Sequence, residues 1–429
     1  MRLKEILYRQ RRNNKIALVE NGRTCSYRDL CDQVDAHLSS VSALTEETGY
    51  VGVFVPNSID FITAYFTVAW LGKVIVPLNI RSSGEEMNCI VNHCRMGLII
   101  TQASILSILY CALKDLTGTV LVYCIDTQAI GRMGSGRRFQ PIRHDRKSHR
   151  VAVLMQSSSA NASCRCAMLT HKSILGAAAS AIKSLDIQKS DRSLICLPLT
   201  LSPVQIGQCI AHLYAGAQLV LENAWYPSED FFSRMDSNAV SNATVLPSFL
   251  KYIAYKKNGL QCDFDALRFF CVLGAPLAAG LLQKLSDRFH GVQIYHHHER
   301  VETYVGIFYQ YSHALCLHEG TGRKPKAQKT CDMLDEYGLP AARSRARQIS
   351  VGGLGVMKGF YSLTDEATRT PRRGLLCIGE TWPLDGTSFP SSWALKNGVL
   401  RGRSCSESGE SVVPNRSNPE SPILQHTGR

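Results

Sequence analysis

Short apolar segments alternate with amphipathic segments along this chain, and this alternation constrains the fold more than any other sequence feature. Residues 51–55 (Val-Gly-Val-Phe-Val) have the composition of a buried strand. The apolar residues at 59–70 recur at helical spacing, and Gly72 is placed to end that helix. Residues 74–78 then predict the next strand. Strand, helix and strand in this order predict an α/β architecture.

The same pattern predicts how the chain is organised. Residues 1–150 are expected to form a first α/β part that ends in a basic, glycine-rich linker at 131–150. Residues 151–310 are expected to form a second α/β part, with strands at 193–197, 218–221, 243–246 and 269–273. Helical patterns thin out after residue 310, so residues 311–401 are expected to be a smaller β-rich portion. The tail at 402–429 is rich in Ser, Pro, Asn and Arg, and little order is expected there.

Charge and hydropathy exclude some classes of function. The net charge is +13, but the basic stretches at 132–150 and 323–347 do not interleave aromatic rings among their cations, as single-strand binders do. A solvated basic surface, without a nucleic acid partner, is therefore expected. Lys73 and Pro77 break the longest apolar stretch, so no membrane span is expected. The first residues have no apolar signal core, which favours a cytoplasmic location.

Cysteine and histidine spacing gives little support for a metal site. The 16 cysteines are scattered and are expected to be free, mostly buried thiols. Cys164 and Cys166 form a close pair, but no second pair stands nearby to complete a zinc site. His296 and His298 would share one face of a strand, but a third ligand is missing. They are better interpreted as part of a pocket wall.

Four segments carry a family resemblance through their order and spacing. They are residues 27–30 (Tyr-Arg-Asp-Leu), 167–171 (Ala-Met-Leu-Thr-His), 274–277 (Gly-Ala-Pro-Leu) and 356–361 (Val-Met-Lys-Gly-Phe-Tyr). Together they resemble the adenylate-forming, AMP-binding superfamily, and the second and fourth are more similar to acyl-CoA ligases than to peptide-synthetase domains. The resemblance implies that superfamily's large N-terminal domain, with two α/β subdomains and a smaller β-rich portion.

The resemblance also implies a reaction and its ligands. Members of the superfamily join a carboxylate to the α-phosphate of ATP, release pyrophosphate, and pass the acyl group to a nucleophile that is often the thiol of CoA. ATP or AMP, Mg²⁺ and a small carboxylic acid or acyl group are therefore the implied ligands, and the acceptor is left open. Such phosphoryl chemistry needs stabilised phosphate charge and a positioned nucleophile.

The implied phosphate-binding loop departs from the family pattern Thr-Ser-Gly-Thr-Thr-Gly-x-Pro-Lys-Gly. Residues 157–166 here read Ser-Ser-Ser-Ala-Asn-Ala-Ser-Cys-Arg-Cys. Ser157 and Ser158 keep hydroxyls, and Arg165 keeps a cation where the family has lysine; these three residues and Ser159 are the candidate cofactor-binding residues of the loop. Side chains at Ser159, Ala162 and Cys166 replace the glycines, and they would obstruct the backbone or forbid positive φ. The segment either still binds phosphate or is only a surface loop. The loss of the glycines favours the second interpretation, a surface loop without phosphate binding.

The implied nucleotide site is mixed. Gly274, Ala275 and Pro276 match the family's adenine-facing turn, although an ordinary strand-to-helix turn explains them equally well. The Tyr-Gly-x-Thr-Glu motif falls on residues 298–302, so His298 replaces the stacking ring and Glu302 takes the magnesium position, with Thr303 after it. Glu302 and Arg165 are the candidate catalytic residues.

Other implied positions are altered as well. Glu380 replaces the ribose-binding aspartate and is either a ribose ligand or a surface glutamate. The acyl-gate pattern Pro-Leu-Phe-His-x-Phe-Gly reads Pro-Leu-Thr-Leu-Ser-Pro-Val at 198–204, so its histidine and both aromatics are absent. Arg403 lies in an Arg-Gly-Arg that resembles the approach to the interdomain hinge. Residues 408–414 resemble the segment beyond it, after which too few residues follow for the small C-terminal domain and its lysine.

Three functions follow as expectations. The first is an acyl-CoA-ligase-like protein with impaired or absent adenylating activity that still binds a nucleotide or acyl ligand. The second is an active ligase or acyltransferase with an altered loop, completed by a partner. The third is an interaction subunit for a full-length ligase or a carrier protein. A decayed gene copy is a further alternative, because the scaffold motifs survive better than the site.

Overall fold

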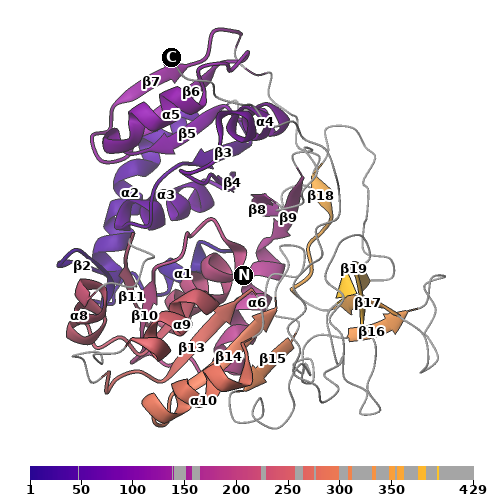
Figure 1. The fold of residues 1–429 in the computed structure, drawn as a ribbon. Helices are drawn as coiled ribbons and strands as arrows, with labels where there is room; N and C mark the ends of the chain where they lie inside the picture. Colours follow the sequence, from indigo (N-terminus) through magenta and orange to yellow (C-terminus); the bar gives the residue numbers. More distant parts are fainter. Residues whose placement is uncertain are drawn as a thin grey trace, which may run out of the picture.

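The computed structural model describes residues 1–46, 48–137, 139, 151–156, 165–223, 229–256, 264–274, 277–298, 308–311, 331–334, 347–352, 355–361, 375–382 and 394–395. They form two eight-stranded sheets and one four-stranded sheet (Figure 1). The expected α/β class, with two α/β subdomains and a smaller β-rich portion, is confirmed.

The first sheet is the upper one in Figure 1, and helices cover both of its faces. Its strands, in sheet order, are β18 (Phe360–Tyr361), β9 (Cys166–Thr170), β8 (Val151–Gln156), β4 (Val74–Pro77), β3 (Tyr50–Val53), β5 (Leu98–Thr101), β6 (Val120–Cys124) and β7 (Ile130–Met133). Its helices are α2 (Tyr27–Leu44), α3 (Ile59–Trp70), α4 (Gly84–Cys94), η1 (Ala103–Ile105) and α5 (Leu106–Ala112). Buried residues of α4 and α5 share one apolar cluster, and those of α2 and α3 belong to another, so the sheet has a core on each face.

The second sheet lies below the first in Figure 1. Its strands, in sheet order, are β15 (Phe308–Tyr311), β14 (Gln293–His298), β13 (Phe269–Leu273), β12 (Asn242–Val245), β10 (Arg192–Ile195), β11 (Gln218–Leu221), β1 (Ile16–Glu20) and β2 (Arg23–Ser26). Around it lie α1 (Glu5–Tyr8), α6 (His171–Leu185), the π-helix η3 (Pro203–Ile210), α7 (Ala211–Ala215), α8 (Glu229–Ser237), α9 (Pro247–Tyr255) and α10 (Ala279–Arg288). The strands from β14 to β1 all run parallel, as α/β connections require.

The four-stranded sheet is the smaller, β-rich portion. Its strands, in sheet order, are β16 (Cys331–Leu334), β17 (Arg347–Gly352), β19 (Leu375–Trp382) and β20 (Ala394–Leu395). All of its neighbouring strands are antiparallel. The tail expected at 402–429 lies outside the described residues.

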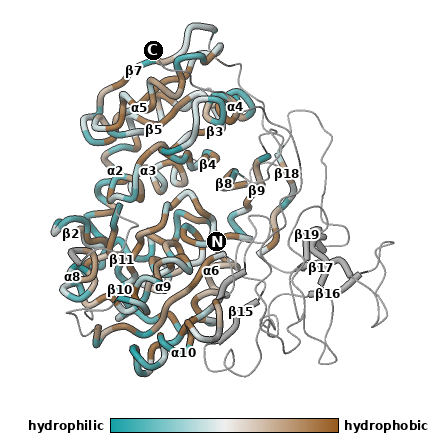
Figure 2. The backbone as a smooth tube through the Cα atoms, in the orientation of Figure 1, coloured by the Kyte–Doolittle hydropathy of each residue, from teal (hydrophilic) through white to brown (hydrophobic). Residues whose placement is uncertain are grey.

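Local sequence signals explain the element boundaries. The Ser26 Oγ accepts from the N–H of Asp29 at 3.1 Å, and the Asp29 carboxylate accepts from the N–H of Ser26 at 2.9 Å, which is a capping box that begins α2. Ser58 caps α3 in a similar way, through the N–H of Phe61 at 3.1 Å. Figure 2 shows apolar residues along the strands of the second sheet and polar residues on outer turns of α10, so burial follows the apolar pattern.

The two large sheets interleave along the chain. The N-terminal hairpin β1–β2 joins the second sheet, because β1 pairs with β11. Strands β8, β9 and β18 join the first sheet, so a cut at residue 150 does not separate the two sheets.

The prediction of a linker that begins at residue 131 is wrong for its first residues. Gly131 and Arg132 belong to β7 and pair with Val122 and Leu121, which gives their backbone groups sheet partners.

Most thiols follow the expectation from the sequence. Nine cysteines are free in the described part of the chain, and all of them except Cys111 are buried. Cys89 in α4 is an exception to the expected free thiols, because it is disulfide-bonded. Its partner is not one of those nine residues. Within the described ranges, no helix is both long and apolar enough to cross a membrane.

Candidate functional site

The segment that matches the phosphate-binding loop lies between two strands of the first sheet. Strands β8 and β9 are antiparallel, and Gln156 pairs with Cys166, so the intervening loop leaves and returns at one end of this hairpin. Ser157, Ser158 and Ser159 lie outside the described residues. Arg165 is described and exposed, and it directly precedes β9. The hairpin therefore presents Arg165 at the base of the loop.

Cys166 replaces a family glycine, and from the sequence its side chain is expected to obstruct the backbone or to forbid positive φ. It is the first residue of β9, fully buried, and absent from the positive-φ residues. Its thiol packs in the same apolar cluster as Cys94 of α4. An extended strand accommodates any side chain at this position, so the backbone at residue 166 does not require a glycine here.

A second family segment forms the strand beside β9. The N–H of Met168 donates to the carbonyl of Gly359, and the N–H of Lys358 donates to the carbonyl of Met168, each at 2.9 Å. In the resulting register Phe360 pairs with Ala167, and the Arg165 guanidinium carbon lies 6.0 Å from the centre of the Phe360 ring. Two motifs almost 200 residues apart in the sequence are thus one structural unit.

The motif residues of the nucleotide site lie at the carboxyl ends of neighbouring strands in the second sheet. Gly274 follows β13 and has φ +96°, a conformation that L-residues rarely adopt. His298 ends β14, one position beyond His297, which pairs with Leu273. Gly274 and His298 are therefore brought to the same edge of the sheet, where α/β proteins bind ligands. Ala275, Pro276, Glu302 and Thr303 lie outside the described residues.

The predicted ribose residue is on a different sheet. Glu380 is in β19, paired with Leu395 of β20. Its side-chain position is not described, and Arg403 lies outside the described residues. The backbone therefore places Arg165, Gly274 and Glu380 on three separate sheets.

The altered acyl-gate segment follows β10, and Leu199 is held from both sides. The N–H of Leu199 donates to the Asn57 Oδ1 at 3.0 Å, and its carbonyl accepts from the Gln205 Nε2 of η3 at 2.8 Å. Gln205 also accepts from the Tyr65 hydroxyl at 3.2 Å. Burial raises the pKa of Tyr65, so this hydroxyl remains a neutral donor. These bonds fix the gate backbone at Leu199, and the departures from the family pattern follow at Thr200, Leu201, Pro203 and Val204.

Asn57 holds the gate segment in place, a role that sequence reasoning missed. Besides accepting from Leu199, its Nδ2 donates to the carbonyls of Leu197 at 2.9 Å and Glu222 at 3.1 Å. It therefore ties the turn after β3 to the ends of β10 and β11. The sequence signal at this position is the Pro-Asn-Ser at 56–58, which is typical of a turn and does not indicate the partners of Asn57.

A small cavity lies beside this junction, at the carboxyl ends of β3, β4, β10 and β11. Its volume is about 50 Å³, and its wall includes Asn57, Phe61, Leu78, Arg81, Leu199 and Thr200. The wall combines apolar side chains with amide, hydroxyl and guanidinium groups. Such a mixture suits a small group with one apolar side and one polar side.

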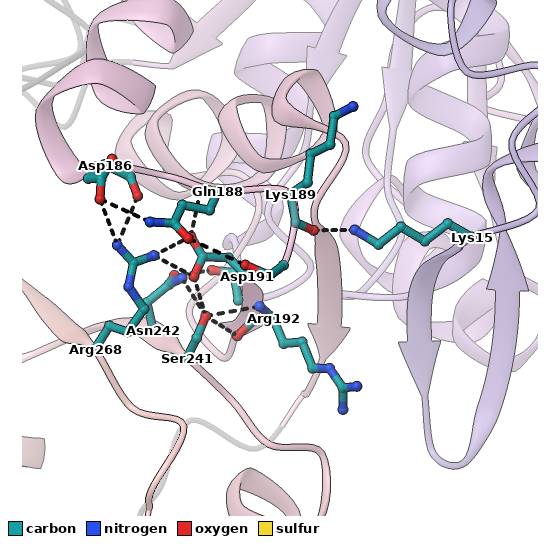
Figure 3. Close-up of polar contacts among 11 residues, drawn as sticks. Lys15, Asp186, Gln188, Lys189, Asp191, Arg192, Ser241, Asn242 and Arg268 are labelled. Atoms are coloured by element: carbon teal, nitrogen blue, oxygen red, sulfur yellow. Dashed lines mark hydrogen bonds and ion pairs between the residues drawn. The ribbon is translucent and has the colours of Figure 1, made fainter.

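A buried polar network supports the opposite edge of the second sheet. Asp191 is 1% exposed and accepts from Arg268 Nη1 through both carboxylate oxygens, at 2.7 and 2.8 Å (Figure 3). The Ser241 hydroxyl donates to the same carboxylate at 2.8 Å. Asp191, Ser241 and Arg268 each precede a parallel strand. They stabilise the amino ends of the strands, away from the edge that carries the nucleotide motifs.

Comparison with known proteins places these features in a family. A family model described as AMP-binding enzyme matches residues 8–361. Feruloyl-CoA synthase from an Amycolatopsis species is 22% identical over 417 residues, which are 93% of this chain and 78% of that protein. The long-chain-fatty-acid–CoA ligase FadD13 of Mycobacterium tuberculosis is 23% identical over 235 residues, which are 54% of this chain and 46% of that protein.

Solved structures share the fold at low sequence identity. O-succinylbenzoate coenzyme A synthetase from Bacillus subtilis, in complex with AMP, superposes with a TM-score of 0.75 at 18% identity and covers 90% of this chain and 77% of its own. The N-terminal domain of FACL13 from Mycobacterium tuberculosis superposes with a TM-score of 0.77 at 18% identity. The match covers 92% of this chain and 100% of that domain. With a family match that spans most of its length and the strand-end motifs in place, this chain belongs to the AMP-binding enzyme family.

Proposed function

We propose that this chain is an acyl-CoA-ligase-like protein that retains a weakened nucleotide site and adenylates carboxylic acids at no more than a trace rate. The similarity to feruloyl-CoA synthase and to FadD13 supports the ligase-like class. The altered phosphate loop supports the low rate.

The loop composition is the observation that carries the proposal. Between β8 and β9 no residue is glycine, and Ala160 and Asn161 stand where the family pattern has two adjacent threonines. A phosphate-binding loop uses backbone N–H groups and hydroxyls as preorganised donors. Loss of one such donor typically lowers kcat by about 10²–10³. Several losses do not add simply, but together they are incompatible with efficient adenylation.

Four residues support nucleotide binding in spite of that loss. Gly274 keeps the left-handed turn at the end of β13, and His298 offers a ring at the end of the neighbouring strand. Arg165 is exposed at the base of the loop, where a cation suits a phosphate. Glu302 supplies a carboxylate for Mg²⁺, a hard cation that prefers oxygen ligands. A solved relative, O-succinylbenzoate coenzyme A synthetase, contains ATP and a magnesium ion.

An active ligase is the second candidate, and the retained charges of Arg165 and Glu302 favour it. The two candidates differ in turnover, so the test measures pyrophosphate release over a panel of aromatic, short-chain and long-chain carboxylic acids. Calorimetry of ATP and ADP with and without Mg²⁺ reports nucleotide binding independently. Measurable nucleotide binding with only trace pyrophosphate release is the expected result. Turnover comparable to that of an ordinary ligase would instead establish the active enzyme.

A further inference from the structure

We propose that Phe360 is a positioning residue for Arg165. Its ring supports the flat guanidinium so that the N–H edge of Arg165 can hold two oxygens of one phosphate or pyrophosphate group. This inference rests on the nucleotide site proposed above and assigns it a phosphate contact. It also connects the segment around residue 360 to the function of the loop.

The geometry places the two side chains together. The Arg165 guanidinium carbon lies 6.0 Å from the centre of the Phe360 ring, within the range of cation–π contacts. Phe360 is only 9% exposed, whereas Arg165 is exposed. One face of the guanidinium can therefore rest on a fixed ring while the other atoms remain open to solvent.

The ring is fixed because the short strand that carries it is anchored on several sides. The backbone bonds between Met168 and the residues at 358–359 hold β18 against β9. The next residue, Tyr361, has its ring 5.2 Å from Tyr50 and 5.3 Å from His93, both in edge-on arrangements. The His93 Nε2 also donates to the Tyr361 carbonyl at 3.3 Å.

The charge of Arg165 is available for an anion. Among the ion pairs of the described residues, none involves Arg165. A guanidinium that stacks through its face still has its in-plane N–H donors, which match two phosphate oxygens at once. A lysine ammonium neither stacks as a plane nor donates as a fork. The arginine and the aromatic ring therefore act as a pair, and the family's lysine would lose this support.

The test uses a double-mutant cycle on the full chain, with Arg165→Lys, Phe360→Leu and the combination of both. The probes are ATP with Mg²⁺ and inorganic pyrophosphate with Mg²⁺, measured by calorimetry, with thermal unfolding recorded for every variant. Phe360→Tyr keeps a ring and serves as the conservative rescue. Arg23→Lys, at the exposed edge strand β2, is the matched control for an arginine-to-lysine change.

Each single variant is expected to weaken binding of both probes by about two- to fivefold, the size of an exposed cation–π contact. The combined variant is expected to lose no more than Arg165→Lys alone, because without the guanidinium the Phe360 ring has nothing to support. Phe360→Tyr and Arg23→Lys should bind as the original chain does. Restoring the family's lysine at residue 165 would therefore impair binding.

Other outcomes separate the two proposals. Binding of ATP with additive losses, or an Arg165→Lys variant that binds as well as the original chain, overturns the positioning role and leaves the nucleotide site intact. A third outcome is that the chain binds pyrophosphate but not ATP, and that the losses in pyrophosphate binding caused by the Arg165 and Phe360 variants are coupled. This outcome supports the positioning role and overturns the nucleotide site. Binding of neither probe overturns both proposals.

Discussion

Arg268 Nη1 donates to both carboxylate oxygens of Asp191, although the two residues lie 77 positions apart. The carboxylate is almost fully buried, while the arginine side chain is about one-third exposed. The Ser241 hydroxyl and the N–H of Gln188 also donate to the Asp191 carboxylate, at 2.8 Å each. The pair holds the start of β13 to the start of β10, so it links strands that are distant in the sequence.

Removal of Arg268 should destabilise the fold strongly. Arg268→Ala leaves the buried Asp191 carboxylate without its counter-charge, and we expect a loss of about 3 kcal/mol in the free energy of unfolding. Arg192→Ala is the matched control, because the Arg192 Nη1 donates only to the carbonyl of Asn238 at an exposed position. Urea unfolding followed by circular dichroism compares the two variants. Equal losses would contradict the assigned role of the buried pair.

Asn57 should be similarly sensitive to substitution. Asn57→Ala removes the partners of the Leu197 and Glu222 carbonyls and of the Leu199 N–H, and we expect a loss of about 2–3 kcal/mol in unfolding free energy. The neighbouring Asn79→Ala is the comparison, since the Asn79 Oδ1 accepts from the N–H of Arg81 at an exposed site. Thermal unfolding that is the same for both variants would show that Asn57 does not hold the gate segment.

Acidic pH should weaken the fold through His171. Burial, aided by nearby Arg2 and the N-terminal amine, lowers the pKa of His171 from 6.5 to about 4. The unfolded chain therefore takes up the proton first. This contribution to stability is complete above about pH 6.5, falls as the pH drops toward 4, and then levels off. The Leu3 N–H donates to the His171 Nδ1 at 3.2 Å, which requires an unprotonated acceptor.

His171→Asn tests this assignment, because an amide oxygen can accept from the Leu3 N–H without titrating. Unfolding free energies of this variant and the original chain, measured from pH 7 to pH 4, should differ in slope. The variant should lose less stability over that interval. His212, whose pKa burial also lowers to about 4, remains in both proteins and contributes equally. Identical slopes would show that His171 does not contribute to the pH dependence of the unfolding free energy.

Glu302 and Arg165 should affect nucleotide binding in different ways. Glu302→Gln is expected to abolish the magnesium dependence of binding, because it replaces a carboxylate ligand of a hard cation. Arg165→Ala is expected to weaken binding with or without Mg²⁺, because the proposed contact of Arg165 with phosphate does not involve the metal ion. Calorimetry of ATP at two magnesium concentrations distinguishes the effects. Binding that persists unchanged in both variants would place the nucleotide elsewhere.

Much of the local structure could be predicted from the sequence. The helix at Ile59–Trp70 has the predicted bounds, and the Ser-x-x-Asp pattern at 26–29 is the capping box that begins α2. The strands Gln218–Leu221 and Phe269–Leu273 also match. These features depend on side chains within a few residues of one another, through capping bonds, turn residues and apolar spacing. The order of four motifs was sufficient to predict the family.

The sequence by itself therefore determined the elements, the α/β class and the residue types available for chemistry. Only the tertiary structure decided that β1 and β2 join the second sheet, that Cys166 is packed in a strand, and that Phe360 meets Arg165. These contacts join segments that are tens to hundreds of residues apart. Local propensity does not specify such partners, because they form only when buried apolar surface offsets the entropy of closing the chain between them.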